Sequence, residues 1–211
     1  MQPALAGVGF MEMDRRVADR PEESSSELRR ARLAPPGGAT YGGRQSSNGA
    51  RMTDQRQPTP AEALLAAGQA GYDLYPRDCS HSVWHMMKLL GLNEPYRVAN
   101  AMMAHFAARG SGWRQVTLAE AGPLADQGKI VVGGLANEGG YGHVQMVMPG
   151  SQPSGGYRMP DGQMARSSGM YPRSAGGAIG SWPGARSRGN RTVRDAWSKN
   201  DWPNVTFWTH D

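Results

Sequence analysis

The sequence predicts an α+β protein in which helices come first and a small antiparallel sheet follows. Apolar residues recur at helical spacing between residues 59 and 127, and from residue 129 the pattern changes to the alternation and β-branched runs of strands. Helices and strands that are segregated along a chain are typical of the α+β class. A chain of 211 residues is long enough for one such domain of about 150 residues, with a further segment beside it.

The first part of the chain is expected to lie outside this domain. Residues 1–57 are rich in Pro, Gly, Ser, Asn and Gln and contain few large apolar side chains, so they are predicted to be a disordered leader. Met52 follows most of this segment, and an extended gene start before it is the alternative interpretation. The ordered domain is expected over residues 58–211.

Four helices are expected, each marked by residues that favour helix ends. Asp, Ser or Thr at the N-cap and Pro at the first position mark a start, and Gly marks an end. The expected helices are residues 60–71 after Thr59, with Pro60 first and Gly71 last; 79–90 between Asp78 and Gly91; 95–108 before Gly110; and a shorter one after Thr117, distorted by Pro123.

Strands are expected in the second half of the chain. The β-branched run 129–135 and the alternating run 143–149 flank the glycine-rich turn 137–142, which predicts a hairpin. Shorter strands are expected near 156–159 and 169–174, and a closing strand over 204–210.

Composition and charge exclude several classes of protein. No apolar run approaches the roughly 18 residues of a membrane helix, and one cysteine excludes both a disulfide scaffold and a Cys-ligated zinc site. The net charge is +5, and residues 151–211 carry eight basic against four acidic side chains. This excess indicates either a solubilising face or a surface for a polyanion. The first residues do not form a signal peptide, so synthesis in the cytoplasm is expected.

The single cysteine lies where a helix is expected to begin. The N-terminus of a helix carries partial positive charge and unpaired N–H groups, which lower the pKa of a thiol and can hold an oxyanion. Cys79 is therefore a candidate nucleophile, with a buried structural cysteine as the alternative.

His143 is the candidate base for this thiol. It opens a predicted strand directly after a glycine-rich turn, and a strand that packs on the cysteine-bearing helix brings such a histidine within reach. The alternative is a histidine that merely caps the edge of a strand. His81 and His85 have a metal-compatible spacing, but no H-E-x-x-H motif is present, so neither a metal site nor a cofactor is expected.

Three motifs resemble one family of enzymes. Residues 78–83 read D-C-S-H-S-V, residues 125–132 fit A-x-x-G-x-x-V-V, and residues 142–147 fit G-H-V-x-x-V. Together they resemble the papain-like NlpC/P60 and CHAP peptidoglycan amidases, and most closely the small amidase effectors of type VI secretion systems. The resemblance covers about residues 70–150.

The resemblance implies a papain-like fold and a set of site residues. Cys79 matches the family nucleophile and His143 the family base. Asp161 is the first candidate for the polar residue that orients the imidazole, with Gln152 and Ser174 as alternatives. The family often has glycine where this sequence has His81. The implied substrate-binding residues are His81, Trp84 and Tyr141.

The implied function is cysteine amidase activity on the peptidoglycan stem peptide, in an antibacterial effector that acts in the periplasm or cell wall of a target bacterium. Its implied partners are the stem peptide, a cognate immunity protein and a secretion-system component. The alternatives are a phage-type endolysin of the same chemistry, a cysteine acyltransferase or deamidase on a protein, and a non-catalytic module that binds a polyanion.

Overall fold

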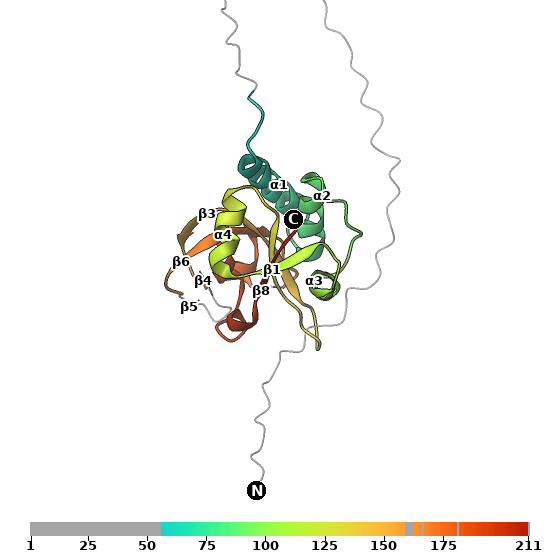
Figure 1. The fold of residues 1–211 in the computed structure, drawn as a ribbon. Helices are drawn as coiled ribbons and strands as arrows, with labels where there is room; N and C mark the ends of the chain where they lie inside the picture. Colours follow the sequence, from blue (N-terminus) through green and yellow to red (C-terminus); the bar gives the residue numbers. More distant parts are fainter. Residues whose placement is uncertain (1–55, 159–162, 166, 181, 211) are drawn as a thin grey trace, which may run out of the picture. The chain divides into compact units, whose positions relative to one another are not determined.

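The α+β class is confirmed in a computed structural model that describes residues 56–158, 163–165, 167–180 and 182–210. These residues form four α-helices and a six-stranded antiparallel sheet (Figure 1). The predicted leader, residues 1–57, lies outside the described residues except for its last two positions, and so does Asp161.

The helices confirm most of the predicted starts. Their bounds are α1 Pro60–Leu74, α2 Cys79–Leu89, α3 Ala99–Ala107 and α4 Leu118–Asp126, and three short 3₁₀ helices follow at Pro183–Ala185, Val193–Ala196 and Trp202–Asn204. Thr59 and Thr117 each form a capping box with the glutamate three residues later. Asp78 caps α2 with its side chain, and Pro123 lies inside α4.

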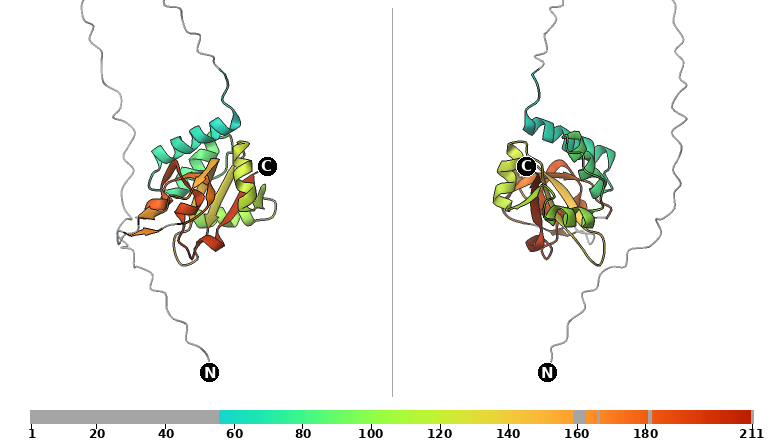
Figure 2. Two further views of the ribbon diagram at one scale, coloured as in Figure 1. Left: turned by 90° about the vertical axis from the view of Figure 1, so that its left-hand side faces the viewer. Right: turned by 45° about the vertical axis from the view of Figure 1, so that its right-hand side comes forward.

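The predicted end of α1 is wrong, because the helix continues through Gly71 to Leu74. Gly71 serves packing rather than termination. A Cβ atom there would lie 2.5 Å from Met86 Cγ and 2.8 Å from the backbone oxygen of Ser82. The missing side chain therefore lets α1 and α2 lie side by side (Figure 2).

The predicted start of α3 is also wrong, since the helix begins at Ala99 rather than near residue 95. Residues 93–98 run as an irregular segment instead. Polar contacts of Glu94 with Arg97, Trp113 and His105 hold this segment.

The sheet has the strand order β1-β8-β2-β3-β6-β7. The predicted hairpin is confirmed, with Leu135 opposite His143. The closing strand is also confirmed, and it pairs with β1 on one side and β2 on the other. The bounds are β1 Trp113–Val116, β2 Val131–Leu135, β3 His143–Pro153, β6 Met170–Gly176, β7 Ser187–Thr192 and β8 Thr206–His210; β4 Tyr157–Arg158 and β5 Met164–Ala165 form a separate pair.

The core lies between these helices and the sheet. Methionines fill much of it, and the buried ones among the described residues are Met86, Met87, Met102, Met103, Met146 and Met148. Helices α2 and α4 both pack against β3, the strand that begins at His143. Among the described residues, no helix combines the length and apolar character needed to cross a bilayer.

Candidate active site

Cys79 is the first residue of α2 and lies against the start of β3. The thiol is 5% exposed, and its sulfur accepts a hydrogen bond from the backbone N–H of Val144. Val144 directly follows His143. The structure therefore brings the two sequence-predicted catalytic segments, the start of α2 and the start of β3, into contact.

The end of β6 makes room for this contact. Strand β6 pairs with β3 only from Met146 and Ala175 onward, so β6 leaves the first residues of β3 unpaired on that side. Beyond β6, the backbone N–H of Ala178 donates to Pro76 O at 3.3 Å. A Cβ atom at Gly177 would lie 2.1 Å from Tyr75 O. Because glycine has no side chain, residue 177 leaves room for the segment 75–78, which leads into Cys79.

The electrostatics of the thiol correct one expectation. The sequence predicts a lowered pKa from the helix N-terminus, but burial raises the pKa of Cys79, and the nearby Asp78 carboxylate adds to the rise. The hydrogen bonds from Val144 N–H and Ser80 act in the opposite direction and are outweighed. At neutral pH the free protein therefore holds Cys79 as a thiol.

His143 is a partly buried residue at the first position of β3. Its Nε2 lies 3.1 Å from Nε2 of Gln145, and its ring meets Trp197 edge-on at a centroid distance of 5.0 Å. Burial lowers the pKa of His143 to about 4. The imidazole is consequently neutral at pH 7 and able to accept a proton.

The turn that delivers His143 is held by a residue that the sequence analysis missed. Asn100 Nδ2 donates to the backbone oxygens of Asn137 and Gly140 at 2.9 and 3.0 Å, and Asn100 Oδ1 accepts from Asn137 N at 2.9 Å. A Cβ atom at Gly142 would lie 2.3 Å from Asn100 Oδ1. Asn100 belongs to α3, so no local sequence signal connects it with this turn.

The predicted substrate-binding residue His81 forms part of an aromatic stack beside Cys79. Its ring stacks on Tyr96 at 3.9 Å and on Tyr75 at 5.3 Å, and its Nδ1 lies 2.7 Å from Asp78 Oδ2. The pKa of Tyr96 is raised by burial and by the charges of Asp78 and Cys79. The phenol of Tyr96 therefore lies close enough to Cys79 to be affected by the charge of its thiolate form.

Trp84, the second predicted substrate-binding residue, contacts the segment that carries Tyr96. Its indole donates to Glu94 O at 2.8 Å, and its ring lies edge-on to Tyr96 at 5.9 Å. It also lines a shallow pocket with Lys88, Asn93, Glu94 and Pro95.

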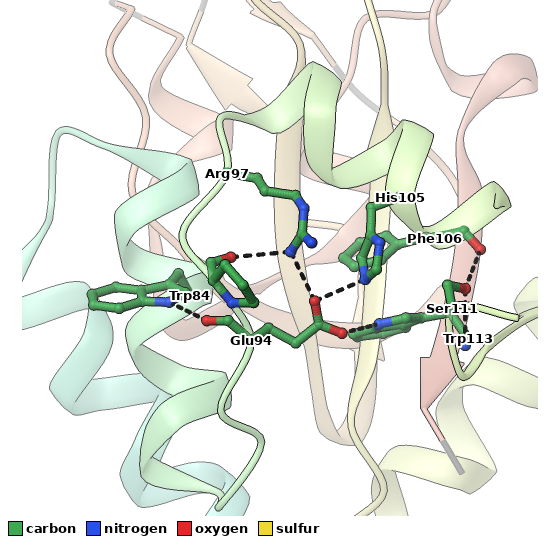
Figure 3. A network of polar contacts seen from close by, with 8 residues as sticks. Trp84, Glu94, Arg97, His105, Phe106, Ser111 and Trp113 are labelled. Carbon is green, nitrogen blue, oxygen red and sulfur yellow. Dashed lines mark hydrogen bonds and ion pairs between the residues drawn. The ribbon is translucent and has the colours of Figure 1, made fainter.

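Glu94 is the centre of the polar network in Figure 3. Its carboxylate accepts hydrogen bonds from Trp113 Nε1 and Arg97 Nη1, both at 2.9 Å, and lies 2.8 Å from His105 Nε2. Partial burial opposes ionisation, but these hydrogen bonds and cations lower the pKa of Glu94. The network fixes the segment that presents Tyr96 to the stack.

The other predicted residues do not join this cluster. Tyr141 is 80% exposed on the turn before His143. Asp161 lies outside the described residues. Gln152 is nine residues beyond His143 on β3, about 30 Å away, and donates to Asn190 O. Ser174 pairs with Val147, four residues along the strand.

The described residues contain no group of three or more His, Cys, Asp or Glu side chains arranged to hold a metal ion. His81 contacts Asp78, and His85 lies edge-on to Tyr75. The chemistry that the Cys79 thiol and the neutral His143 imidazole support is acyl transfer, with the thiol as nucleophile and the imidazole as base.

Among the arginine side chains that the structure describes in the C-terminal third, most bind the protein's own backbone. Arg188 pairs with Asp73 at 2.6 Å, whereas the four others described donate to carbonyl oxygens. These carbonyl contacts are Arg173 to Gly189, Arg186 to Ala178 and Gly180, Arg191 to Gly156, and Arg194 to Trp197. Much of the basic excess therefore holds loops in place.

Comparison with protein-family models and with curated proteins finds no match for this chain. The fold and the site define an α+β protein with a buried thiol at a helix start and a neutral histidine on the adjoining strand.

Proposed function

We propose that this chain is a papain-like cysteine amidase of the NlpC/P60 and CHAP type that cleaves an amide bond in the peptidoglycan stem peptide. The observation that carries the proposal is the hydrogen bond from Val144 N–H to the Cys79 sulfur, which joins the cysteine-bearing helix to the histidine-bearing strand. The motif resemblance supplies the substrate class.

The proposed reaction begins with both groups neutral. His143 accepts the Cys79 proton as the thiolate attacks the amide carbonyl carbon, and backbone N–H groups at the start of α2 hold the oxyanion. The imidazolium then gives its proton to the leaving amine, and the acyl group stays on sulfur. Water, deprotonated by His143, hydrolyses this thioester and restores the free enzyme.

The raised pKa of Cys79 and the lowered pKa of His143 bear on how the nucleophile forms. They disfavour a resting thiolate–imidazolium pair. The proton transfer is therefore proposed to accompany substrate binding, when the substrate excludes water and its carbonyl meets the N–H groups. In this proposal Tyr75, His81 and Tyr96 form one wall of the substrate cleft.

The proposed setting is that of an antibacterial effector acting in the periplasm or cell wall of a target bacterium. A secretion-system component and an immunity protein are the partners that this setting implies. The loop-binding roles of the arginines favour the amidase over the alternative module that binds a polyanion.

The test is digestion of purified sacculi, with soluble fragments identified by mass spectrometry. The wild type should release fragments cut in the stem peptide, the Cys79→Ala and His143→Ala variants should release none, and His210→Gln on distant β8 should behave as the wild type. Equal release by the wild type and Cys79→Ala would overturn the proposal. If the folded wild type releases no fragments, the proposal is also overturned, and a protein substrate is favoured instead.

A further inference from the structure

Gln145 is a buried polar residue that neither the sequence motifs nor the proposed reaction uses. It lies two residues after His143 on β3 and is 1% exposed. Side chains at positions i and i+2 of a strand project from the same face. Accordingly, its amide nitrogen lies 3.1 Å from Nε2 of His143.

The amide of Gln145 is held from a second side. Its Nε2 also donates to the backbone oxygen of Ala185 at 3.2 Å, whereas its Oε1 is buried and has no partner among the described residues. A buried acceptor without a donor destabilises the folded state. Such a cost indicates that the amide has a use beyond packing.

We propose that Gln145 is the positioning residue of His143, holding the imidazole through its Nε2 and supporting first the resting and then the reactive tautomer by rotation of its amide. The proposal rests on the amidase function above. Because Gln145 occupies Nε2, Nδ1 is the nitrogen that exchanges a proton with Cys79, so the reactive form of the ring is the Nε2–H tautomer.

The two orientations of an amide give this contact a chemical consequence. In the observed orientation the Gln145 N–H donates to Nε2, so the resting proton of His143 lies on Nδ1. After rotation of the amide by 180°, Oε1 accepts from Nε2–H, and Nδ1 has the lone pair that a base needs. Rotation gives Oε1 its partner and removes the donor from Ala185 O. One neutral side chain can therefore support both tautomers.

Other groups near the imidazole do not fill this role in the described residues. Trp197 contacts the ring only through its aromatic edge. None of the charged or titratable groups on the surrounding elements forms an ion pair with His143 among the described residues. These groups are Asp78 and Cys79 at the start of α2, Glu138 in the turn, Arg186, and Arg194 and Asp195 of the second 3₁₀ helix.

The test measures the tautomer of His143 by ¹⁵N NMR of full-length protein, which needs no substrate. The wild type should show mainly the Nδ1–H tautomer near pH 7. The isosteric Gln145→Met variant should lose this bias, and Gln145→Glu, which can only accept, should favour Nε2–H and raise the pKa of His143 by about one unit or more. Gln115→Met on the exposed edge of β1 should match the wild type.

The same variants separate this inference from the amidase proposal. With sacculi, Gln145→Met should lower kcat by about 100-fold with little change in KM, and Gln145→Glu should move the acidic limb of the pH profile upward and recover part of the rate. A wild-type ring in the Nε2–H tautomer, or an unchanged tautomer in folded Gln145→Met, would overturn the inference. Correct tautomers without wall cleavage by the wild type would overturn only the amidase function.

Discussion

Cys79 and His143 have pKa values that burial displaces in opposite directions, and both displacements remove charge. A helix N-terminus and a hydrogen bond from Val144 N–H favour the thiolate, but Cys79 is too well buried for these groups to prevail. The same low-dielectric surroundings would strengthen the interactions of the substrate proposed above. In the proposed reaction, charge therefore forms on the two groups as the substrate binds and is not present beforehand.

The lowered pKa of His143 predicts a loss of stability in acid. Because the folded pKa of about 4 lies below the value of about 6.5 in the unfolded chain, the unfolded state binds more protons between these values, and stability falls as the pH falls through them. Between pH 7 and pH 4.5 this linkage is worth about 2 kcal/mol. Urea unfolding of the wild type and of His143→Gln at both pH values measures this difference. The free energy of unfolding should fall by about 2 kcal/mol less in the variant than in the wild type. An equal loss in the wild type and the variant would contradict the prediction.

At the scale of elements, the position of Cys79 depends on the close approach of two backbone segments. Gly177 follows β6, and a Cβ atom there would lie 2.9 Å from both N and O of Asp78 as well as 2.1 Å from Tyr75 O. These are backbone atoms of the segment that starts α2, so a side chain at residue 177 must displace it.

Gly177→Ala is therefore expected to lower the free energy of unfolding by about 1–3 kcal/mol and to change the alkylation rate of Cys79. The matched control is Gly155→Ala, where no atom lies within 4 Å of the added Cβ. The control should change the free energy of unfolding by less than about 1 kcal/mol, and in the stabilising direction, because alanine makes the unfolded chain less flexible. It should leave the alkylation rate of Cys79 unchanged. Urea unfolding and iodoacetamide kinetics measure both effects. Equal results for the two variants would contradict the packing described here.

Elements with strong local signals could be predicted from the sequence, and elements defined by distant partners could not. The helix starts at Thr59 and Thr117 and the hairpin before His143 have local signals, and all three are confirmed. Strand β7 has the polar sequence S-R-G-N-R-T and becomes a strand only through pairing with β6, so no hydrophobic alternation revealed it.

The same division applies to the site. Cys79 and His143 were candidates because each follows a local cue, a cap and a glycine-rich turn. Gln145 had a usable signal, since the alternation of residues 143–149 places His143 and Gln145 on one face of the strand. Asn100 had none, because it reaches the turn across 37 residues of sequence.

At the scale of the whole described chain, the sheet is completed by its last strand. Strand β8 lies between β1 and β2, pairing Phe207 with Val116 on one side and with Gly133 on the other (Figure 1). Contacts this distant in sequence slow folding, because a long loop must close before they form. The helix and strand that carry Cys79 and His143 therefore belong to a core that is complete only when the C-terminal segment has joined it.

Phe207 gives a direct test of this dependence. Its side chain is 4% exposed and fills the space above Gly133, where a Cβ atom would lie 2.8 Å from the ring. Phe207→Ala should lower the free energy of unfolding by about 3–5 kcal/mol, because it leaves a cavity between the three strands. Tyr141→Ala removes the side chain of a residue that is 80% exposed and should change the free energy of unfolding by less than about 0.5 kcal/mol. Urea denaturation followed by tryptophan fluorescence measures both values, and a similar small cost for the two variants would exclude a closing strand at the centre of the sheet.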